Sequence, residues 1–484
     1  MCRSHDVVGL AVFLELRHVL RELERGLGHD RHFDVGTHLV NHLRVLLQVA
    51  CLYFGSFVPC SRRLCRPSRR PAASRTTIAT EPASARVRRR KSARSVARAA
   101  VGEKSSKEPA TPLRFADRGV MKFGAKRPQE NFMSDRAPTG IVMLNMGGPD
   151  SLDGVGPFLE KLFRDRELIE LPMQSVLGPF IVSRRTPKVV EVYRSIGGGS
   201  PITRGTREQG DLLAVALDRI SPSTAPHKSY IAFRYTPPYA HEALEQMLRD
   251  KVHRAVAFSQ YPQYACPTSG SSLNDLWRAV DEMKLGNHFD WSVIDRWPTH
   301  PALIDTLCEG IREALGRFPP EHRDEVVLVF SAHSLPLKVI YRGDSYPQEV
   351  GATVQAIVDT LGLSQRYMLA YQSAVGPVKW LGPSTVSVIE QLSKQGATRV
   401  LVVPVAFTSD HVETLEEIDI QLRATAARCG IEQFERAPVP NARPTFINGL
   451  ADLVAEHLAS GRKHSTQYKL KCPGCPREGC RELR

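Results

Sequence analysis

From Thr139 onward, short apolar runs rich in Val, Ile and aromatic residues alternate with segments whose apolar residues recur at helical spacing. Strands that alternate with helices in this way build βαβ units and a mainly parallel sheet. The pattern therefore predicts an α/β fold. The predicted strands are 140–145, 229–235, 255–259, 291–295, 326–331, 367–372 and 399–406, and the predicted helices are 207–218, 238–249, 272–282, 302–317, 346–361 and 445–458.

Two of the predicted strands end alike. V-L-V-F-S-A-H (327–333) and V-V-P-V-A-F-T-S-D-H (402–411) each run from an apolar strand into a histidine. We take this likeness to indicate two similar α/β halves with a cleft between them. Ligands of open α/β sheets bind beyond the carboxyl ends of the strands, so the residues that follow each strand are the candidates for a site.

His333 follows the apolar run 326–330 and should stand at the carboxyl end of its strand. Histidine titrates near neutral pH and can accept or pass on protons. An isolated histidine would more simply be a neutral ring bonded to the backbone. His333 is not isolated, because Asp410, His411 and Glu413 follow the second strand. Together these residues predict an active site.

Acidic residues continue beyond Glu413. If a helix begins near Ser409, then Asp410, Glu413 and Glu417 share one of its faces. Such a face offers oxygen ligands to a hard divalent cation, in a fixed site or along a transient path. The helix dipole alone also favours acids at a helix start, so a purely structural origin stays open.

The net charge of +14 is concentrated in one segment. Residues 61–100 hold twelve Arg and Lys91 against a single acid, Glu81, and are rich in Ser and Ala. This composition is typical of a mitochondrial or plastid transit peptide. A disordered linker or a nucleic-acid-binding arm is the alternative, but no aromatic residue interleaves with the arginines. We therefore expect a leader and no nucleic-acid partner, while the acid-containing residues 1–60 stay unassigned.

Residues 171–188 place an apolar patch beside Arg184, Arg185 and Lys188. No stretch of the chain reaches the roughly 18 consecutive apolar residues that a membrane-spanning helix needs. The patch is thus either a core segment followed by a solvated turn, or an apolar lip that touches a membrane surface while its cations meet anionic groups.

Three cysteines crowd the end of the chain, in the segment C-P-G-C-P-R-E-G-C. Cys472, Cys475 and Cys480 supply three thiolates, and a metal site needs a fourth ligand. Zinc could use this spacing as readily as an iron–sulfur cluster, so the residues alone leave both open.

An ordered set of motifs then resembles the ferrochelatase family. The resemblance covers about Thr139 to Cys480 and implies a chelatase-like fold of two Rossmann-like halves whose parallel sheets flank an active-site cleft. It also implies insertion of Fe(II) into protoporphyrin IX to form protohaem. The motifs are T-G-I-V-M-L-N-M-G-G-P (139–149), R-R-T-P-K (184–188), Y-R-S-I-G-G-G-S-P (193–201), F-R-Y (233–235), Q-Y-P-Q-Y (260–264), R-W-P-T-H (296–300), F-S-A-H-S-L-P (330–336) and A-F-T-S-D-H-V-E-T-L (406–415).

The resemblance assigns roles position by position. His333 resembles the histidine proposed to take protons from the pyrrole nitrogens. Glu413 and His411 resemble the other polar pair of the site, supported by Asp410, and His333 and Glu413 are also expected to bind iron transiently. Gln421 stands where some relatives place a further acid. The residues that resemble the porphyrin pocket are Met146, Tyr193, Tyr261, Trp380 and Phe407 around the macrocycle, and Arg185, Ser200 and Arg234 as polar groups, with Arg185 a candidate for pairing a propionate.

The resemblance also bears on the tail. Animal-type relatives take the fourth cluster ligand from a cysteine in Q-Y-P-Q-Y-S-C, and this chain has Q-Y-P-Q-Y-A-C, ending at Cys266. Cys266, Cys472, Cys475 and Cys480 are therefore expected to bind a 2Fe–2S cluster. Plant forms lack this tail, which favours mitochondria over plastids. The resemblance further implies a homodimer in peripheral contact with the matrix side of the inner mitochondrial membrane.

The resulting organisation has five parts: an unassigned segment 1–60, a leader 61–115, a first α/β half with the porphyrin lip 139–300, a second half 301–460, and a cluster-binding tail 461–484. Two other functions would fit the same fold, namely a tetrapyrrole carrier without catalysis and an iron–sulfur sensor. Simple binding needs no base facing an acidic path, which argues against the carrier.

Overall fold

The computed structural model describes residues 136–168, 173–376 and 378–468. These residues are all part of one compact unit. The predicted leader, the segment before it and the three tail cysteines lie outside the described residues. No helix in the described ranges is long and apolar enough to cross a membrane.

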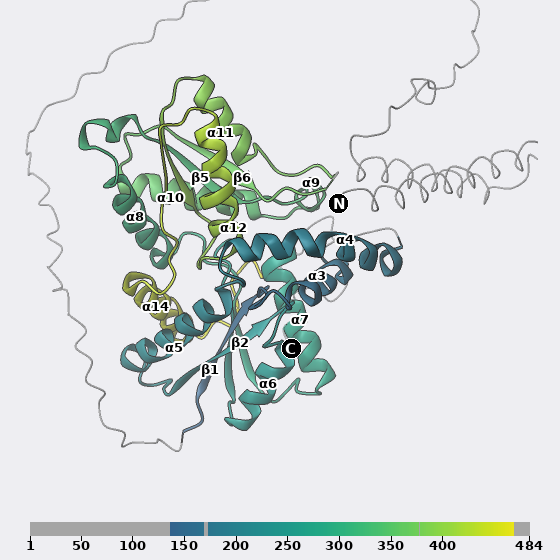
Figure 1. Ribbon diagram of the computed structural model, residues 1–484. Coiled ribbons are helices and arrows are strands. Elements are labelled where there is room, and N and C mark those ends of the chain that lie inside the picture. Colours follow the sequence, from purple (N-terminus) through teal and green to yellow (C-terminus); the bar gives the residue numbers. More distant parts are fainter. Residues whose placement is uncertain (1–135, 169–172, 377, 469–484) are drawn as a thin grey trace, which may run out of the picture. The chain divides into compact units, whose positions relative to one another are not determined.

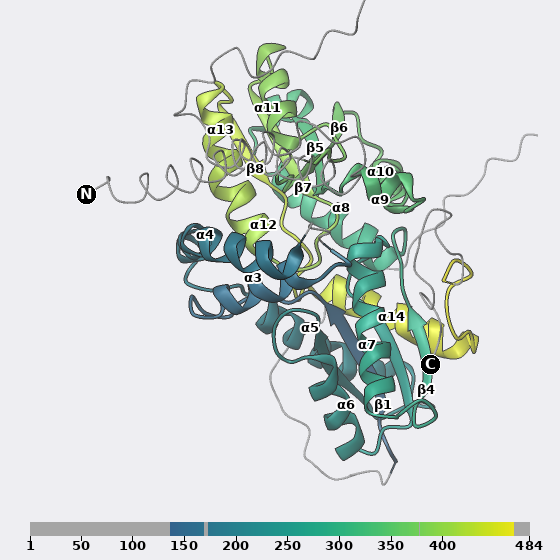
Figure 2. The ribbon, with the colours of Figure 1, turned by 90° about the vertical axis from the view of Figure 1, so that its right-hand side faces the viewer.

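Two four-stranded sheets form the framework, and all their strand pairs are parallel. The first has the order β2-β1-β3-β4 and the second β6-β5-β7-β8 (Figures 1 and 2). The predicted fold class of two parallel α/β halves is confirmed. The strands are β1 (Thr139–Asn145), β2 (His227–Phe233), β3 (Arg254–Ser259), β4 (Asp290–Ile294), β5 (Val327–His333), β6 (Tyr367–Gln372), β7 (Arg399–Pro404) and β8 (Gln433–Arg436).

Helices cover both faces of each sheet, which explains why the strands read as nearly continuous apolar runs. The helices are α3 (Val155–Arg164), α4 (Gln174–Ser195), α5 (Ile202–Ile220), α6 (Ala240–Arg249), α7 (Ser271–Glu282), α8 (Pro301–Leu315), α9 (Leu337–Tyr341), α10 (Tyr346–Leu361), α11 (Thr385–Lys394), α12 (Val412–Leu415), α13 (Arg423–Arg428) and α14 (Pro444–Ser460). Shorter turns are η1 (Cys266–Gly270), η2 (Pro320–Glu325) and η3 (Glu417–Leu422), of which η1 and η3 are π-helices.

Alternate residues of each strand enter different cores, as the two-residue period of a strand requires. In β1, Val142 and Leu144 pack with α6 and α7, whereas Ile141 and Met143 pack on the opposite face with α5. That second core continues without a break into Phe330 of the second sheet. The two halves therefore share one hydrophobic core, to which α8 and α14 contribute.

Hydrogen bonds between the halves reinforce this shared core. The Gln209 side chain of α5 donates to the carbonyl oxygens of Thr408 and Asn441 in the second half, at 2.9 and 3.0 Å. Gln263, which follows β3, donates to the carbonyl of Val405 at 3.1 Å. These bonds fix the chain segment that follows β7 against the first half.

The helices α3, α4, α9, α11 and α13 and the strand β8 were not predicted from the sequence, and α12 begins three residues after Ser409, where a helix start was considered. Helix α4 contains Pro179 and Pro187, which normally interrupt a helical pattern. The strand-end likeness also proves to lie within one half, because β5 and β7 are neighbours in the second sheet. Its use as a sign of two related halves was wrong, although the two halves exist.

Candidate functional site

Several sequence-predicted site residues come together at the carboxyl ends of β1, β5 and β7. Met146 follows β1, and its backbone N–H donates to the hydroxyl of Tyr261 at 2.9 Å. The Tyr261 hydroxyl in turn donates to the Asn145 side chain at 3.1 Å. Burial and the nearby Glu413 carboxylate both act to raise the pKa of Tyr261. Tyr261 is thus a neutral hydrogen-bonding group held close to the residues that follow β7.

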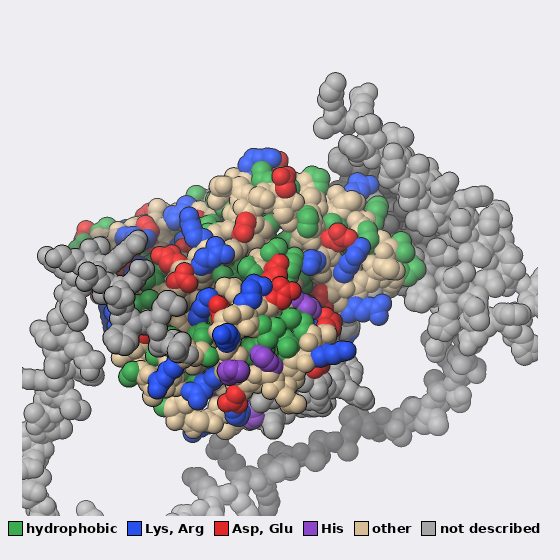
Figure 3. Space-filling model, turned by 90° about the horizontal axis from the view of Figure 1, so that it is seen from below, with side chains coloured by type: hydrophobic (Ala, Val, Ile, Leu, Met, Phe, Trp, Pro, Cys, Tyr) green, Lys and Arg blue, Asp and Glu red, His purple; other side chains and the backbone are tan. Residues whose placement is uncertain are grey.

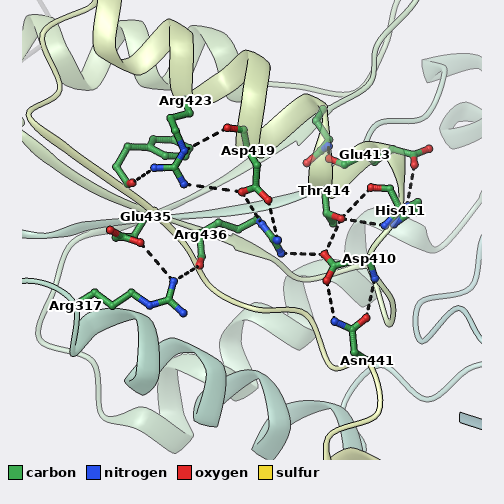
Figure 4. Close-up of polar contacts among 12 residues, drawn as sticks. Arg317, Asp410, His411, Glu413, Thr414, Asp419, Arg423, Glu435, Arg436 and Asn441 are labelled. Atoms are coloured by element: carbon green, nitrogen blue, oxygen red, sulfur yellow. Dashed lines mark hydrogen bonds and ion pairs between the residues drawn. The ribbon is translucent and has the colours of Figure 1, made fainter. Parts of the chain in front are cut away.

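His411 and Glu413 form an ion pair, with 2.9 Å between His411 Nε2 and a carboxylate oxygen (Figure 4). The Nδ1 of His411 lies 2.9 Å from the Ser409 carbonyl, which can only accept a hydrogen bond. Nδ1 therefore donates to this carbonyl, and the carboxylate beside Nε2 favours the protonated ring. Its ring also contacts Phe407 edge-on, with 4.7 Å between centroids.

The pKa values of the pair agree with this charge state. Burial acts to raise the pKa of Glu413, but the charge and the hydrogen bond of His411 outweigh it and lower this pKa to about 2. Burial acts to lower the pKa of His411, and the Glu413 carboxylate reverses the effect and raises it. The site therefore contains a fixed negative charge and a fixed positive charge side by side.

His333 is bonded differently. It ends β5, and its Nδ1 lies 2.6 Å from the carbonyl of Ser334. Nδ1 must donate to that carbonyl, so the neutral ring keeps its lone pair on Nε2. For Nε2 we find no partner in the part of the chain that the structure describes. His333 lies close enough to Glu413 to lower the pKa of that carboxyl, which places the ring beside the ion pair.

A second carboxylate lies beyond Glu413. Glu417 begins the π-helix η3, and one of its oxygens accepts hydrogen bonds from Ser373 at 2.5 Å and from Gln372 at 3.0 Å. Burial and the Glu413 charge raise the pKa of Glu417. Glu413 and Glu417 thus lie within electrostatic range of each other. The pKa of Glu413 is lowered, whereas the pKa of Glu417 is raised.

The expected single helical face was wrong for Asp410. Helix α12 begins only at Val412, with His411 as its N-cap, so Asp410 precedes the helix. Its carboxylate accepts hydrogen bonds from Thr414 and Asn441 and lies beside Arg436, instead of projecting with Glu413 (Figure 4). Gln421 bonds both Glu416 oxygens at 2.8 Å and offers no carboxylate of its own.

Among the apolar residues predicted to pack on a macrocycle, two lie against the ion pair. Tyr193 of α4 is buried and feels the Glu413 charge, which together with burial raises its pKa. Phe407 lies against the His411 ring. Trp380 is half-buried on a separate loop, where its indole N–H donates to the Val375 carbonyl at 2.8 Å and its backbone pairs with Pro336, three residues beyond His333.

The predicted polar pocket residues are more dispersed. Ser200 is buried, and its backbone N–H donates to the carbonyl of Pro149 at 2.7 Å. Arg185 of α4 is half-buried, with its guanidinium 5.8 Å from the centre of the Phe163 ring. Arg234 is neutralised by Asp165 at 2.8 Å and Asp275 at 2.6 Å.

Arg234 therefore lines a different space. A cavity of about 620 Å³ is bounded by Arg234 and charged side chains of the α3 end and of α7. None of the residues around the His411–Glu413 pair lines it. Its lining residues are Lys161, Arg164, Asp165, Arg166, Glu167, Arg234, Tyr235 and Arg278.

Cys266 carries a half-buried thiol at the start of η1. The chain that leads to the tail cysteines is anchored close to it. The Arg296 guanidinium donates to Gln467 at 2.9 Å and lies 4.3 Å from the centre of the Tyr264 ring, two residues before Cys266. The hydroxyl of Tyr468 accepts a hydrogen bond from Trp277 at 3.0 Å. Cys472 is four positions beyond Tyr468, at most about 14 Å of extended chain.

No three His, Cys, Asp or Glu side chains gather as a metal cage within the described ranges. Charged side chains of both signs are intermingled on the face seen in Figure 3, without a broad positive patch there. This agrees with the concentration of net positive charge in residues 61–100.

Comparison with known proteins decides the family. The family model described as ferrochelatase matches residues 138–458. The chain is 53% identical to the mitochondrial ferrochelatase of Bos taurus, over 74% of this chain and 86% of the relative. The chain belongs to the ferrochelatase family. It is an enzyme, a metal chelatase that inserts iron into protoporphyrin.

Other relatives agree. The mitochondrial ferrochelatase of Homo sapiens is 51% identical over 75% of this chain and 85% of the relative. That of Drosophila melanogaster is 46% identical over 73% and 92%. Among solved structures, SirB from Bacillus subtilis with Fe³⁺ matches with a TM-score of 0.40 and 9% identity, over 67% of this chain and 98% of that chain, a likeness too weak to bear on function.

Some residues of the site were not found from the sequence. Asn441 and Arg436, which hold Asp410, come from the chain around β8. Gln372 and Ser373 were noted only as a strand end, yet both bond Glu417. The position of Gln372 and Ser373 directly after a strand was the available signal, whereas Arg436 and Asn441 carried none.

Proposed function

We propose that His333 and the His411–Glu413 pair perform the insertion of ferrous iron into protoporphyrin IX, which yields protohaem in the last step of haem biosynthesis. The observation that carries this assignment is the unengaged Nε2 of His333, beside a carboxylate whose pKa is lowered to about 2. A free base and a permanent negative charge are what removal of pyrrole protons and handling of a divalent cation require.

The protons leave toward His333. Insertion replaces two pyrrole N–H protons by the metal ion. The Nε2 lone pair of His333 accepts one proton and releases it to water before it accepts the second, while Nδ1 stays bonded to Ser334 and keeps the ring oriented. The adjacent Glu413 carboxylate stabilises the imidazolium that forms, because the two charges are opposite and partly shielded from water.

Iron arrives as a substrate. Glu413 offers an ionised oxygen, and Glu417, bonded to Ser373 and Gln372, offers a second carboxylate that ionises as the cation approaches. Oxygen and imidazole ligands suit a divalent cation in transit, and His333 and Glu413 hold it until the porphyrin nitrogens take over. The lack of a closed cage in the described chain fits passage better than storage.

The macrocycle is held by apolar and aromatic groups around this centre. Met146, Tyr193, Tyr261 and Phe407 provide the wall nearest the ion pair, and Trp380 closes the pocket from the loop after β6. Ser200 and Arg185 supply polar contacts, Arg185 to a propionate. Arg234 is paired with two aspartates and lines a separate cavity, so we assign it no contact with the porphyrin.

The protein is mitochondrial, as its relatives are named. We place it on the matrix side of the inner membrane as a homodimer, with residues 61–115 as the import leader. Helix α4 supports the membrane contact, because Met173, Val176 and Phe180 are 58%, 66% and 51% exposed on its first two turns. Large apolar side chains exposed together on one helix favour contact with a lipid surface.

We further propose that Cys266, Cys472, Cys475 and Cys480 hold a 2Fe–2S cluster. Cys266 is half-buried at the start of η1, and Arg296 contacts both Gln467, five residues before Cys472, and the ring of Tyr264, two residues before Cys266. When bound, the cluster would tie the tail to the first half. Replacement of Cys266 by Ser should remove iron and sulfide from the purified protein and lower its melting temperature, whereas Cys429→Ser should do neither. One zinc per chain without sulfide would contradict the cluster.

The deciding experiment for the activity uses the full chain, protoporphyrin IX and Fe(II) without oxygen, and follows haem formation by absorbance. We expect turnover, and its loss in His333→Ala. A protein that binds porphyrin tightly but forms no haem would be a tetrapyrrole carrier, and would overturn the assignment of His333 as a base.

A further inference from the structure

The strand that the sequence did not reveal, β8, delivers an arginine to the segment behind the site. Arg436 ends β8, which pairs with β7 in parallel register. Its guanidinium is only 13% exposed. It donates from Nε and Nη2 to the two carboxylate oxygens of Asp419, at 2.8 and 2.9 Å, and its Nη1 lies 3.2 Å from Asp410 (Figure 4).

The two aspartates lie on either side of the carboxylates assigned to iron. Asp410 comes directly before α12, which carries Glu413, and Asp419 lies in η3, which begins with Glu417. One guanidinium therefore spans the start and the end of the segment that bears both carboxylates. Asn441 also holds Asp410. The Asn441 side-chain N–H donates to the Asp410 carboxylate at 2.8 Å, and the Asn441 side-chain oxygen accepts from the Asp410 backbone N–H at 2.9 Å.

This segment needs an external support. Helix α12 has four residues, and the π-helix η3 interrupts the chain before α13 continues. Helices this short are not stable by themselves, and π-helical turns are rare and locally strained. The spacing between Glu413 and Glu417 is therefore set by the contacts that hold the two ends of this interrupted segment.

An arginine is suited to this task in a way that a lysine is not. The planar guanidinium binds one carboxylate through two parallel hydrogen bonds and still directs a third nitrogen toward a second carboxylate. Burial acts to lower the pKa of Arg436, and Asp419 and Asp410 together raise it, so the bridge stays charged.

We propose that Arg436 is a positioning residue for metal insertion, which sets the spacing of Glu413 and Glu417 by bridging Asp410 and Asp419 across the interrupted helix. Arg436 touches neither the iron nor the porphyrin. The inference rests on the proposed role of Glu413 and Glu417 and adds the residue that keeps them in register. Loss of the bridge should therefore impair metal handling more than porphyrin binding.

The test compares Arg436→Lys and Asp419→Asn with Arg317→Gln in the full chain. Arg317 is a matched control, because it pairs with Glu435 beside Arg436, is 43% exposed, and reaches Arg436 only at its backbone carbonyl, at 3.5 Å, and not at the bridging guanidinium. Steady-state kinetics with Fe(II) and with Zn²⁺ give separate KM values for metal and porphyrin. Hydrogen exchange of amides 412–422 reports the order of the segment in each folded variant.

We expect Arg436→Lys to raise the metal KM or lower kcat by about tenfold, with the porphyrin KM changed less than about twofold. Asp419→Asn, which keeps the arginine and the shape of its partner, should give a smaller change in the same direction and faster exchange in residues 412–422. Arg317→Gln should match the unmodified chain.

The bridge is overturned if folded Arg436→Lys and Asp419→Asn both behave like Arg317→Gln, or if metal and porphyrin KM rise equally. A lowered melting temperature of these two variants with unchanged kinetics would also overturn the proposal, since it would show that the bridge has a purely structural role. Full activity of Glu413→Gln would instead remove the proposed site itself, so the two failures are distinguishable.

Discussion

His333 ends β5 and His411 lies in the segment after β7, and the two rings differ in what faces their second nitrogen. His333 donates from Nδ1 to a backbone carbonyl and keeps a lone pair on Nε2. His411 also donates from Nδ1 to a backbone carbonyl, but its Nε2 faces the Glu413 carboxylate at 2.9 Å. A carboxylate on the second nitrogen therefore separates a free base from a fixed cation.

This difference teaches how one sheet edge can serve proton and metal chemistry together. A base must exchange protons near neutral pH, whereas a structural imidazolium must not. The neighbouring carboxylate decides which role each ring takes. Each of the following experiments tests whether the two rings are as different as their hydrogen bonds indicate.

The largest effect should follow from removal of the free base. General base catalysis contributes about 10²- to 10⁴-fold to a rate, so His333→Ala should lower kcat by at least about a hundredfold. The variant should fold normally, because the ring makes a single hydrogen bond to a neighbouring backbone carbonyl. Haem formation by absorbance and a thermal melt check both parts. Near-native turnover in a folded His333→Ala would place the base elsewhere.

The next effect concerns the fixed charge. Glu413→Gln keeps the shape of the side chain and removes the charge, so kcat should fall by about tenfold or more while the porphyrin KM changes little. Porphyrin is held mainly by apolar packing, which the substitution leaves in place. A raised porphyrin KM with unchanged kcat would reduce Glu413 to a substrate-binding residue.

Much of this arrangement could be predicted from the sequence, for a clear physical reason. Strands covered on both faces must be apolar at nearly every position, so β5 and β7 stand out as runs of Val, Leu and Phe. The residues that follow them, His333 and His411, are then located at the sheet edge by the strand direction alone.

Other parts could not be predicted, because their signal is not local. Strand β8 reads Q-F-E-R, too short and too polar to resemble a strand, and it is ordered only by pairing with β7. Asp410 was assigned to a helical face that assumed regular 3.6-residue spacing, whereas the helix begins later and passes into a π-helix. That departure depends on Arg436 and Asn441, which contact Asp410 from the other side of β7.

A smaller effect should follow from Glu417→Gln. Its carboxylate accepts from Ser373 and Gln372, and burial together with Glu413 raises its pKa. An amide keeps the shape, and its oxygen can still accept both hydrogen bonds, so kcat should change only about twofold to threefold, with a larger rise in the metal KM. Kinetics at varied Fe(II) and Zn²⁺ concentrations check this. An effect as large as that of Glu413→Gln would show that both carboxylates must be ionised.

The smallest expected effect is on stability, and its sign follows from the two pKa shifts. The pKa of Glu413 falls from 4.5 to about 2 on folding, since His411 outweighs the effect of burial, and such a carboxyl stabilises the native state above its unfolded pKa. The pKa of His411 rises, so its contribution is complete below about pH 6.5 and is lost as the pH rises through the folded value. Both contributions are therefore complete between about pH 4.5 and 6.5.

Urea unfolding of the unmodified chain and of Glu413→Gln should therefore differ most near pH 5.5, by about 1–2 kcal/mol in the free energy of unfolding. The difference should shrink as the pH rises through the raised pKa of His411, which then loses its proton, and toward about pH 3, as the unfolded carboxyl gains one. A difference that is constant across this range would mean that His411 is neutral in the native protein. His411 would then be a second free base like His333, and the division of labour between the two strand ends would disappear.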